Sequence, residues 1–315
     1  MSIPTTLLVS CWDGGVHVFS GSDRRHELAG RAVRHLARGP HGGVLGIVDG
    51  DSLCGRAATG EWTVLGKSEV PLACAVFDGA HIYVGTDDAR VLRLSDAGVL
   101  VPLGSFDAVD GRASWFAGGA WIDGAWMGPP LGVRSLTATA DGATLLANVH
   151  VGGIPRSSDA GATWHATIAV ECDVHQVLAH PTDPDLVVAA TAQGLGVSRD
   201  RGQTWTIETN GLAAPYCSAV TFVGEDLLVS ASADHFAADG FVYRRRIASS
   251  GALKPVDAGF PSSTHGIVDT GCMDAHRRSV AIADRGGNLY ASTEGGDAWS
   301  LRASGLASPS SVVVI

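Results

Sequence analysis

Two histidines lie in short apolar stretches, from which each could bind a metal or act as a buried hydrogen-bonding residue. His150 stands in "NVHVGG" and His175 in "DVHQV", with Asp173 two positions before His175. Because side chains alternate along a strand, Asp173 and His175 are expected on the same side. Imidazole, thiolate and carboxylate groups are all competent metal ligands. The residues that could complete such a site are Cys217, Cys272 and Asp284.

The alternative for each histidine is a hydrogen-bonded position in the core. The sequence shows no short ligand spacing of the kind that structural metal sites use, and its six cysteines form no CxxC pair. We expect these cysteines to be small buried apolar residues. We therefore assign no metal, and we expect no cofactor.

A short string rich in Asp, Gly and Trp recurs along the chain and shows which elements position these residues. It is "SSDAGATW" at 157–164, "SRDRGQTW" at 198–205 and "STEGGDAW" at 292–299. The first two copies begin 41 residues apart, and the third follows about two periods later. Before each copy lies a strand of β-branched and small residues, a glycine-containing turn and a second short strand. With a further apolar run upstream, the repeating unit is four short strands.

Four strands repeating every 40–50 residues or so predict a β-propeller. Damaged copies of the unit fill the rest of the chain and give about seven blades. We predict an all-β fold with one domain over residues 1–315, a seven-bladed β-propeller of four-stranded antiparallel blades. The opening "TTLLVSC" and the final "SSVVVI" are expected to pair, so that the C-terminal strand joins the N-terminal blade and closes the ring.

The repeated string resembles the Asp box, S-x-D-x-G-x-T-W, of BNR-repeat proteins, a group that includes sialidase-like propellers. The aspartates and tryptophans that match are Asp159, Trp164, Asp200, Trp205 and Trp299. The third copy departs from the pattern, with Glu294 in place of Asp and Ala298 in place of Thr. The whole chain is similar to propellers of the photosystem-assembly-factor type and to bacterial glycosidase-like propellers.

The chemistry of the string favours a structural role. An aspartate can accept backbone N–H bonds inside its own turn, and glycine permits a positive φ. A tryptophan can pack between blades while its N–H donates a hydrogen bond. We therefore interpret each string as a tie across a hairpin turn and not as a catalytic signature.

The topology of a four-stranded blade sorts the polar residues onto two faces. The starts of the innermost strands and the turns between second and third strands share one face, and the Asp boxes lie on the other. We expect the shared face to form a funnel mouth that binds a ligand. The candidate ligand-binding residues are Arg134, His150, Asp173, His175, Tyr216, Cys217, Asp234, His235, Asp284, Arg285 and Trp126. Asp269 is expected at the same mouth.

Three long insertions fall on this face as well. They are residues 104–132, with three tryptophans, residues 232–240 and residues 257–271. Loops on a rigid scaffold are where binding specificity is usually built. The alternative for the tryptophans is that they plug the channel or cover blade edges.

Charge and hydropathy exclude several classes of partner. The formal charge of −10 leaves no basic surplus for phosphates, so we expect no nucleic acid partner. No run of about 18 apolar residues occurs, and the start of the chain does not show the pattern of a signal peptide. We expect no membrane partner, a cytoplasmic location and a monomer.

Three functions remain open, and the sequence does not decide whether the protein is an enzyme. The first is a binding propeller that holds a small polar ligand or a protein segment at the mouth. The second is an Asp-box carbohydrate hydrolase or lyase, and the third is a metal-dependent enzyme at a His/Cys mouth. A true sialidase is not expected: Arg34, Arg134 and Arg285 could form an arginine triad, but no Glu is clearly placed to activate Tyr216.

Overall fold

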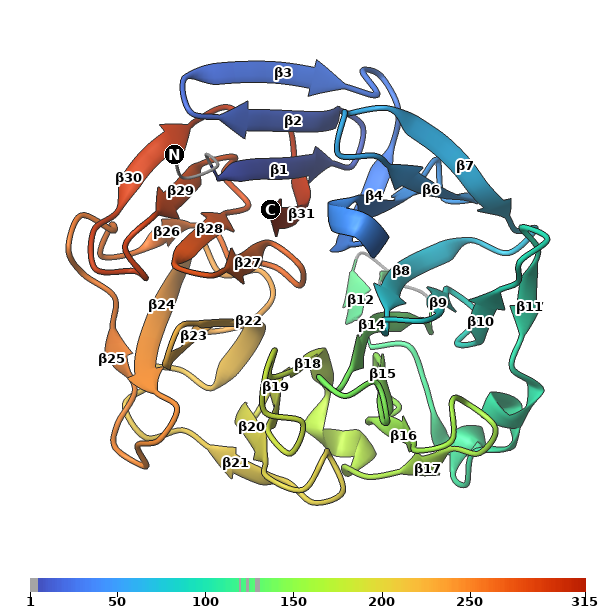
Figure 1. Ribbon diagram of the computed structural model, residues 1–315. Coiled ribbons are helices and arrows are strands. Elements are labelled where there is room, and N and C mark those ends of the chain that lie inside the picture. The colour runs from blue at the N-terminus through green and yellow to red at the C-terminus, as the bar shows by residue number, and fades with distance from the viewer. Residues whose placement is uncertain (1–4, 119, 123–124, 128–130) are drawn as a thin grey trace.

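The computed structural model describes residues 5–118, 120–122, 125–127 and 131–315, with the backbone alone described at 120–122 and 125–127. These residues form seven four-stranded antiparallel blades around a central axis, one blade carrying an extra short strand (Figure 1). The predicted all-β, seven-bladed propeller is therefore confirmed. Among the described residues, no helix has the length and apolarity needed to cross a bilayer.

The first four blades run from the N-terminus, and their strands are given from the centre outward. Blade 1 contains β31 (Pro309–Val314), β1 (Thr6–Cys11), β2 (Gly15–Ser20) and β3 (Asp23–Glu27). Blade 2 contains β4 (Val33–Arg38), β5 (Val44–Val48), β6 (Ser52–Arg56) and β7 (Trp62–Lys67). Blade 3 contains β8 (Leu72–Phe77), β9 (Ile82–Thr86), β10 (Val91–Leu94) and β11 (Leu100–Pro102). Blade 4 contains β14 (Val133–Ala138), β15 (Leu145–Val149), β16 (Pro155–Ser157) and β17 (His165–Ala166).

The remaining blades complete the circle. Blade 5 contains β18 (Val174–Ala179), β19 (Val187–Thr191), β20 (Gly194–Ser198) and β21 (Thr206–Glu208). Blade 6 contains β22 (Tyr216–Val223), β23 (Asp226–Ser232), β24 (Asp239–Arg246), β25 (Lys254–Pro255) and the extra β26 (Thr264–His265). Blade 7 contains β27 (Met273–His276), β28 (Ser279–Ala283), β29 (Leu289–Ser292) and β30 (Ser300–Ala303). The short 3-10 helices are η1 (Pro40–Gly42), η2 (Gly104–Ala108), η3 (Arg112–Ser114) and η4 (Val170–Cys172).

Burial decreases from the inner strands to the outer strands, as the sequence of each strand requires. The apolar β19, "VVAAT", is buried along its whole length, whereas the charged β3, "DRRHE", is largely exposed. Inner strands are covered on both faces by neighbouring blades, so both of their faces are apolar. The hydrophobic clusters accordingly lie between blades, as where Leu45 and Ile47 of blade 2 pack with Val84 of blade 3. Each such side chain stabilises the fold by about 1.5–3 kcal/mol.

The cysteines belong to this buried part of the molecule. All six are free and buried, as the sequence analysis predicted. Burial raises the pKa of every one of their thiols. They therefore behave as small apolar side chains in the protonated form.

The ring closes through the predicted pairing of the two ends. Strand β31 pairs antiparallel with β1, with Leu7 opposite Val314 and Val9 opposite Val312. Thr6 and Ile315 exchange both backbone hydrogen bonds at 2.9 Å. The C-terminal strand is thus the innermost strand of the N-terminal blade, and this part of the prediction is confirmed.

The three copies of the repeated string form the turns between third and fourth strands of blades 4, 5 and 7. The Asp159 carboxylate accepts hydrogen bonds from the Thr163 N–H at 2.8 Å, the Thr163 hydroxyl at 2.6 Å and the Ser157 hydroxyl at 2.8 Å. Asp200 accepts the matching bonds from the N–H and hydroxyl of Thr204 at 2.9 and 2.6 Å. Each carboxylate therefore bonds residues of its own turn.

The tryptophans of the strings pack at the same turns. Trp164 and Trp299 each donate their indole N–H to the carbonyl three positions earlier, at 3.2 and 3.0 Å. Trp205 of blade 5 instead donates to the hydroxyl of Thr167, which follows blade 4, at 3.1 Å. The string thus fastens a turn in each of the three blades that carry it, and in one case it joins two blades.

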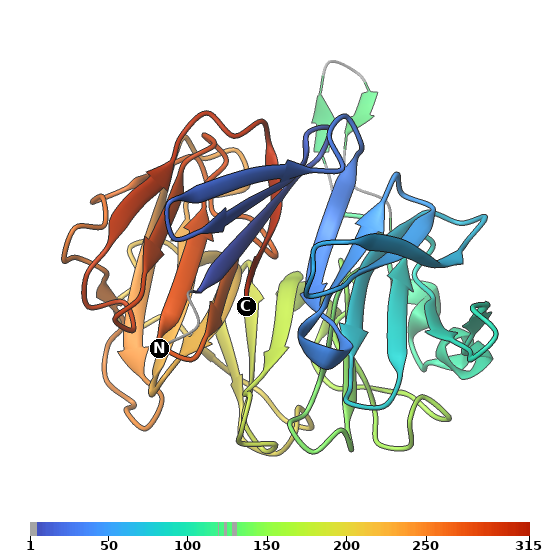
Figure 2. The same cartoon turned by 45° about the horizontal axis from the view of Figure 1, so that its top comes forward.

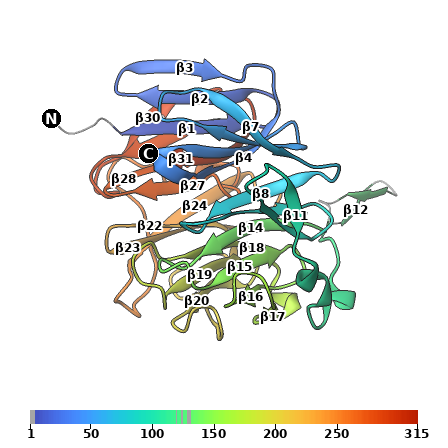
Figure 3. The same ribbon diagram turned by 45° about the vertical axis from the view of Figure 1, so that its right-hand side comes forward.

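The link between blades 3 and 4 adds a hairpin that stands out from the ring. Its two strands are β12 (Ala120–Ile122) and β13 (Ala125–Met127), which pair antiparallel. Figures 2 and 3 show this hairpin projecting beyond the blades. By the order of strands, it belongs to the face on which the innermost strands begin.

Candidate functional site

A β-bulge recurs at the second or third residue of the innermost strand and alters which side chains reach the mouth. In blade 4, Arg134 is the extra residue between two paired neighbours, and in blade 5 His175 has the same place. The other described strands that show this shift carry it at Ser310, Arg34, Ala73 and Ser218. A bulge bends its strand and re-aims a side chain, and bulges are frequent next to functional sites. Arg134 and His175 are therefore not placed by simple alternation.

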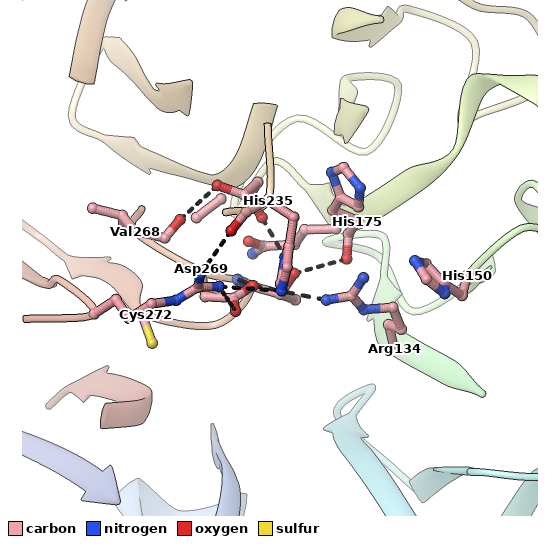
Figure 4. A network of polar contacts seen from close by, with 12 residues as sticks. Arg134, His150, His175, His235, Val268, Asp269 and Cys272 are labelled. Carbon is pink, nitrogen blue, oxygen red and sulfur yellow. Dashed lines mark hydrogen bonds and ion pairs between the residues drawn. The ribbon is translucent and has the colours of Figure 1, made fainter. Parts of the chain in front are cut away.

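The first polar group at the mouth is built around Asp269. One oxygen of its carboxylate lies 3.7 Å from the Arg134 guanidinium, and the other lies 3.4 Å from that of Arg285. Arg285 also donates to the His235 carbonyl at 2.7 Å. Arg134 starts blade 4 and Asp269 precedes blade 7, so their contact joins blades that are not neighbours. Figure 4 shows Arg134 extending toward Asp269.

Charge compensation keeps Asp269 ionised at this position. Burial alone would raise the pKa of its carboxyl, but the charge of Arg134, the Thr270 N–H and the charge of Arg285 together lower it. Burial and the neighbouring Arg285 lower the pKa of His235. Two guanidinium groups thus share one carboxylate, which leaves an excess of one positive charge.

The second polar group contains His150, Asp173 and His175. The Nε2 atom of His150 lies 3.6 Å from one Asp173 oxygen, and Nε2 of His175 lies 3.7 Å from the other. One ligand atom from each of the three residues lies within 4.8 Å of the other two. Both histidines are buried, whereas the Asp173 side chain is 31% exposed. The two histidines and Asp173 therefore meet on one rim.

Asp173 reaches this position by a different route from the one expected. The alternation argument placed it on the same strand as His175, but Asp173 precedes β18 and is the left-handed residue that ends η4, with φ 46°. Asp and Asn adopt this conformation more readily than most residues. The carboxylate therefore turns back toward His175 from a loop. Its pKa, which burial would raise, is lowered by His175, His150 and Arg134.

Of the other predicted residues, Tyr216 contacts one of the two polar groups through its side chain, whereas the side chains of Cys217 and Asp284 have other partners. The Tyr216 ring packs on the ring of His175 with centroids 4.5 Å apart. Burial raises the pKa of the Tyr216 hydroxyl to about 12. Cys217 contributes its carbonyl, but its side chain lies in the hydrophobic core and its pKa is raised to about 12 by burial. Asp284 accepts hydrogen bonds from Asn288 and from the His265 N–H.

The remaining predicted residues are Asp234, Cys272, Trp126 and the Arg34 of the possible arginine triad. Asp234 accepts the Phe236 N–H at 2.7 Å within its own loop. Cys272, like Cys217, packs in the core. Neither thiol therefore joins the group of His150, Asp173 and His175, which we call the His-Asp group. Trp126 lies in β13, and its side chain is outside the described residues. Arg34 forms a separate ion pair with Asp87 at 2.6 Å and is not in contact with Arg134 or Arg285 in the described contacts.

Three exposed aromatic side chains lie in loops at the mouth, and none of them is among the ligand-binding candidates predicted from the sequence. Trp12 lies in the turn after β1, Phe236 in the turn after β23, and Phe116 beside Val151 in the turn after β15. Their exposed fractions are 46%, 69% and 56%. Among the described residues, the other large exposed apolar side chains are aliphatic. Trp12 and Phe236 each follow a second strand, and that position was the signal that could have identified them, whereas Phe116 lies in the link between blades 3 and 4.

Comparisons with known proteins place the fold and nothing finer. No protein-family model matches the chain, and no curated protein matches it. An ancestral GH74 enzyme has a similar structure, with a TM-score of 0.62 and 14% identity over 82% of this chain and 36% of that enzyme. The computationally designed Ika8 protein is also similar, with a TM-score of 0.57 and 12% identity over 95% of this chain and 83% of the design. The chain spans little more than a third of the GH74 enzyme, and at such identities the likeness shows the fold alone.

Proposed function

We propose that the protein binds a small polar ligand of the saccharide class at the mouth. The proposal rests on three exposed aromatics, Trp12, Phe116 and Phe236, in loops on the same face of the ring as the polar group of Arg134, Asp269 and Arg285. Ligand sites combine apolar and aromatic walls with a few converging polar groups. Sugars present both apolar C–H faces and hydroxyl groups, which fits this combination.

The charges at the mouth favour a ligand with an acidic group. Arg134 and Arg285 share a single carboxylate, so one guanidinium charge is not balanced within that group. Guanidinium groups bind carboxylates with two parallel hydrogen bonds where geometry allows. A uronate-containing sugar should therefore bind more tightly than its neutral counterpart.

Hydrolysis is the second candidate, because one structural neighbour is a GH74 enzyme. Glycoside cleavage ordinarily uses two carboxyl groups, one of which holds a proton because its pKa is raised. At this mouth the pKa values of both Asp173 and Asp269 are lowered. Neither group is suited to be the general acid, so binding is favoured over cleavage.

Calorimetric titration with neutral and uronate-containing oligosaccharides tests the proposal. We expect a uronate oligosaccharide to bind, and Arg285→Ala and Phe236→Ala each to weaken binding at least tenfold, about 1.4 kcal/mol. Leu301→Ala is the matched control for Phe236→Ala, because Leu301 is 56% exposed on the outer strand of blade 7. Its affinity should equal that of the parent protein.

Two results would contradict the proposal. One is the absence of binding to every sugar at millimolar concentration. The other is release of reducing ends that Asp173→Asn or Asp269→Asn abolishes, because it would make cleavage the function of the mouth.

A further inference from the structure

The ring nitrogens of His175 are assigned by its hydrogen bond to the backbone. Its Nδ1 lies 2.5 Å from the Cys217 carbonyl, which can only accept, so Nδ1 carries the proton. In the neutral ring, Nε2 then has a free lone pair. This Nε2 is buried and has no hydrogen-bond partner among the residues described. A histidine fixed through Nδ1 with Nε2 free is the arrangement typical of a metal ligand.

Asp173 offers a second unsatisfied atom at the same place. Its Oδ1 is buried without a hydrogen-bond partner in the described part of the chain. A buried carboxylate oxygen without a partner is costly, and a bound cation would remove that cost. The orphan atoms of Asp173 and His175 therefore indicate a ligand between them.

We propose that His150, Asp173 and His175 bind a divalent transition-metal ion of the zinc class. Two imidazoles and one carboxylate suit such ions, and three protein ligands leave a coordination position open for a further ligand. The present separations of 3.6 and 3.7 Å need only small side-chain movements to bring the ligand atoms onto one ion. The partly exposed Asp173 gives the ion a route from the mouth.

The surrounding charges permit a cation at this position. Arg134 lies 3.7 Å from Asp269 and shares that carboxylate with Arg285, so the negative charge that faces the ion is that of Asp173. Arg285 faces the same carboxylate, and His235 lies beside Arg285.

Binding through His150 also requires a change at the link between blades 3 and 4. The Nδ1 atom of His150 accepts the Gly118 N–H at 3.2 Å, so in the neutral ring the proton is on Nε2. If Nε2 binds the ion, the proton moves to Nδ1, which can no longer accept from Gly118. The ion should therefore release the Gly118 amide.

The test uses purified full-length protein that has been treated with a chelator and dialysed. Zn²⁺ alone is titrated by calorimetry, and Co²⁺ alone is followed by its visible absorption. We expect one equivalent of either ion to bind, and Asp173→Asn to weaken binding at least tenfold. Asn tolerates the left-handed backbone at this position, so this variant should fold. His175→Asn provides a second test with the same expectation.

Asp87→Asn is the matched control, because Asp87 is a mouth aspartate that pairs with Arg34 outside the His-Asp group. It should bind Zn²⁺ like the parent protein. Hydrogen exchange should show faster exchange of the Gly118 amide once Zn²⁺ is added. Binding that is equally tight in Asp173→Asn, or no binding of either ion, would overturn the proposal.

The metal site goes beyond the proposed saccharide function, and the experiments can reject either one without rejecting the other. Zn²⁺ binding without sugar binding would leave the metal site standing and remove the saccharide function. Sugar binding in protein that takes up neither ion would remove the metal site alone.

Discussion

The two faces of the ring hold their aspartates in opposite ways. On the face that carries the repeated string, Asp159 bonds residues no more than four positions away in its own turn. On the mouth, Asp173 and Asp269 contact side chains that come from other blades. One oxygen of Asp173 is buried without a partner among the described residues, whereas both oxygens of Asp159 accept hydrogen bonds.

This difference separates aspartates that make the fold from aspartates that could act on a ligand. A carboxylate satisfied by its own turn stabilises that turn and has little capacity left for another group. A carboxylate held between blades is placed by the whole ring and retains that capacity. Aspartates at different places therefore have different roles. Those that contact only their own turn stabilise the fold, and those that contact other blades are the candidates for ligand binding.

The largest expected effect comes from opening the ring that keeps the two faces apart. Deleting residues 312–315 removes three buried valines from β31, which should cost roughly 5 kcal/mol or more. Because β31 is the innermost strand of blade 1, sugar binding and the folded state should be lost together on heating. Thermal unfolding measures this, and a truncated protein that melts like the parent would show that closure does not hold the ring.

The next largest effects are expected when one tryptophan on each face is replaced by alanine. Trp164 is buried at the turn formed by the repeated string, so Trp164→Ala should lower the free energy of unfolding by about 3–5 kcal/mol and leave sugar affinity unchanged. Trp12 is 46% exposed at the mouth, so Trp12→Ala should weaken sugar binding with little loss of stability. Denaturant unfolding measures the stability of each variant, and calorimetry measures its affinity for the sugar. If both variants lose stability and affinity to the same extent, the two faces do not differ in function.

The smallest effect concerns pH and Asp159. Hydrogen bonds from Thr163 and Ser157 lower the pKa of its carboxyl from 3.8 to about 2. A lowered pKa stabilises the folded protein above the ordinary value, and this stabilisation is lost as the pH falls from about 4 to about 2. The melting temperature of Asp159→Asn should therefore lie below that of the parent at neutral pH. The gap should narrow below about pH 4, and a gap that stays constant would show that the ionised carboxylate does not stabilise the turn.

The ring could be predicted from the sequence because its signals are local and repeated. The three copies of the string mark the same turn in blades 4, 5 and 7, and the apolar "SSVVVI" follows the last repeat as a single strand that can complete the blade opened by "TTLLVSC". Strand order alone then placed His150 and His175 on one face, and the structure brings their ring centroids to 6.4 Å.

The details of the mouth could not be predicted in the same way. A bulge is an offset between two strands, and neither strand alone encodes the extra residue at Arg134 or His175. The inward position of Cys217 and the hydrogen bonds of Asp284 depend on packing between blades, which a single repeat does not show. The exposure of Phe236 likewise depends on the absence of a covering neighbour among the described residues.

The distribution of the thiols gives the molecule a built-in set of probes for local opening. Cys11, Cys54, Cys74, Cys217 and Cys272 lie in or just before five different blades, and Cys172 lies in the link before blade 5. A buried, protonated thiol does not react with alkylating reagents until its surroundings open. Labelling rates of single-cysteine variants would therefore show whether the blades separate one at a time or the whole circle opens at once.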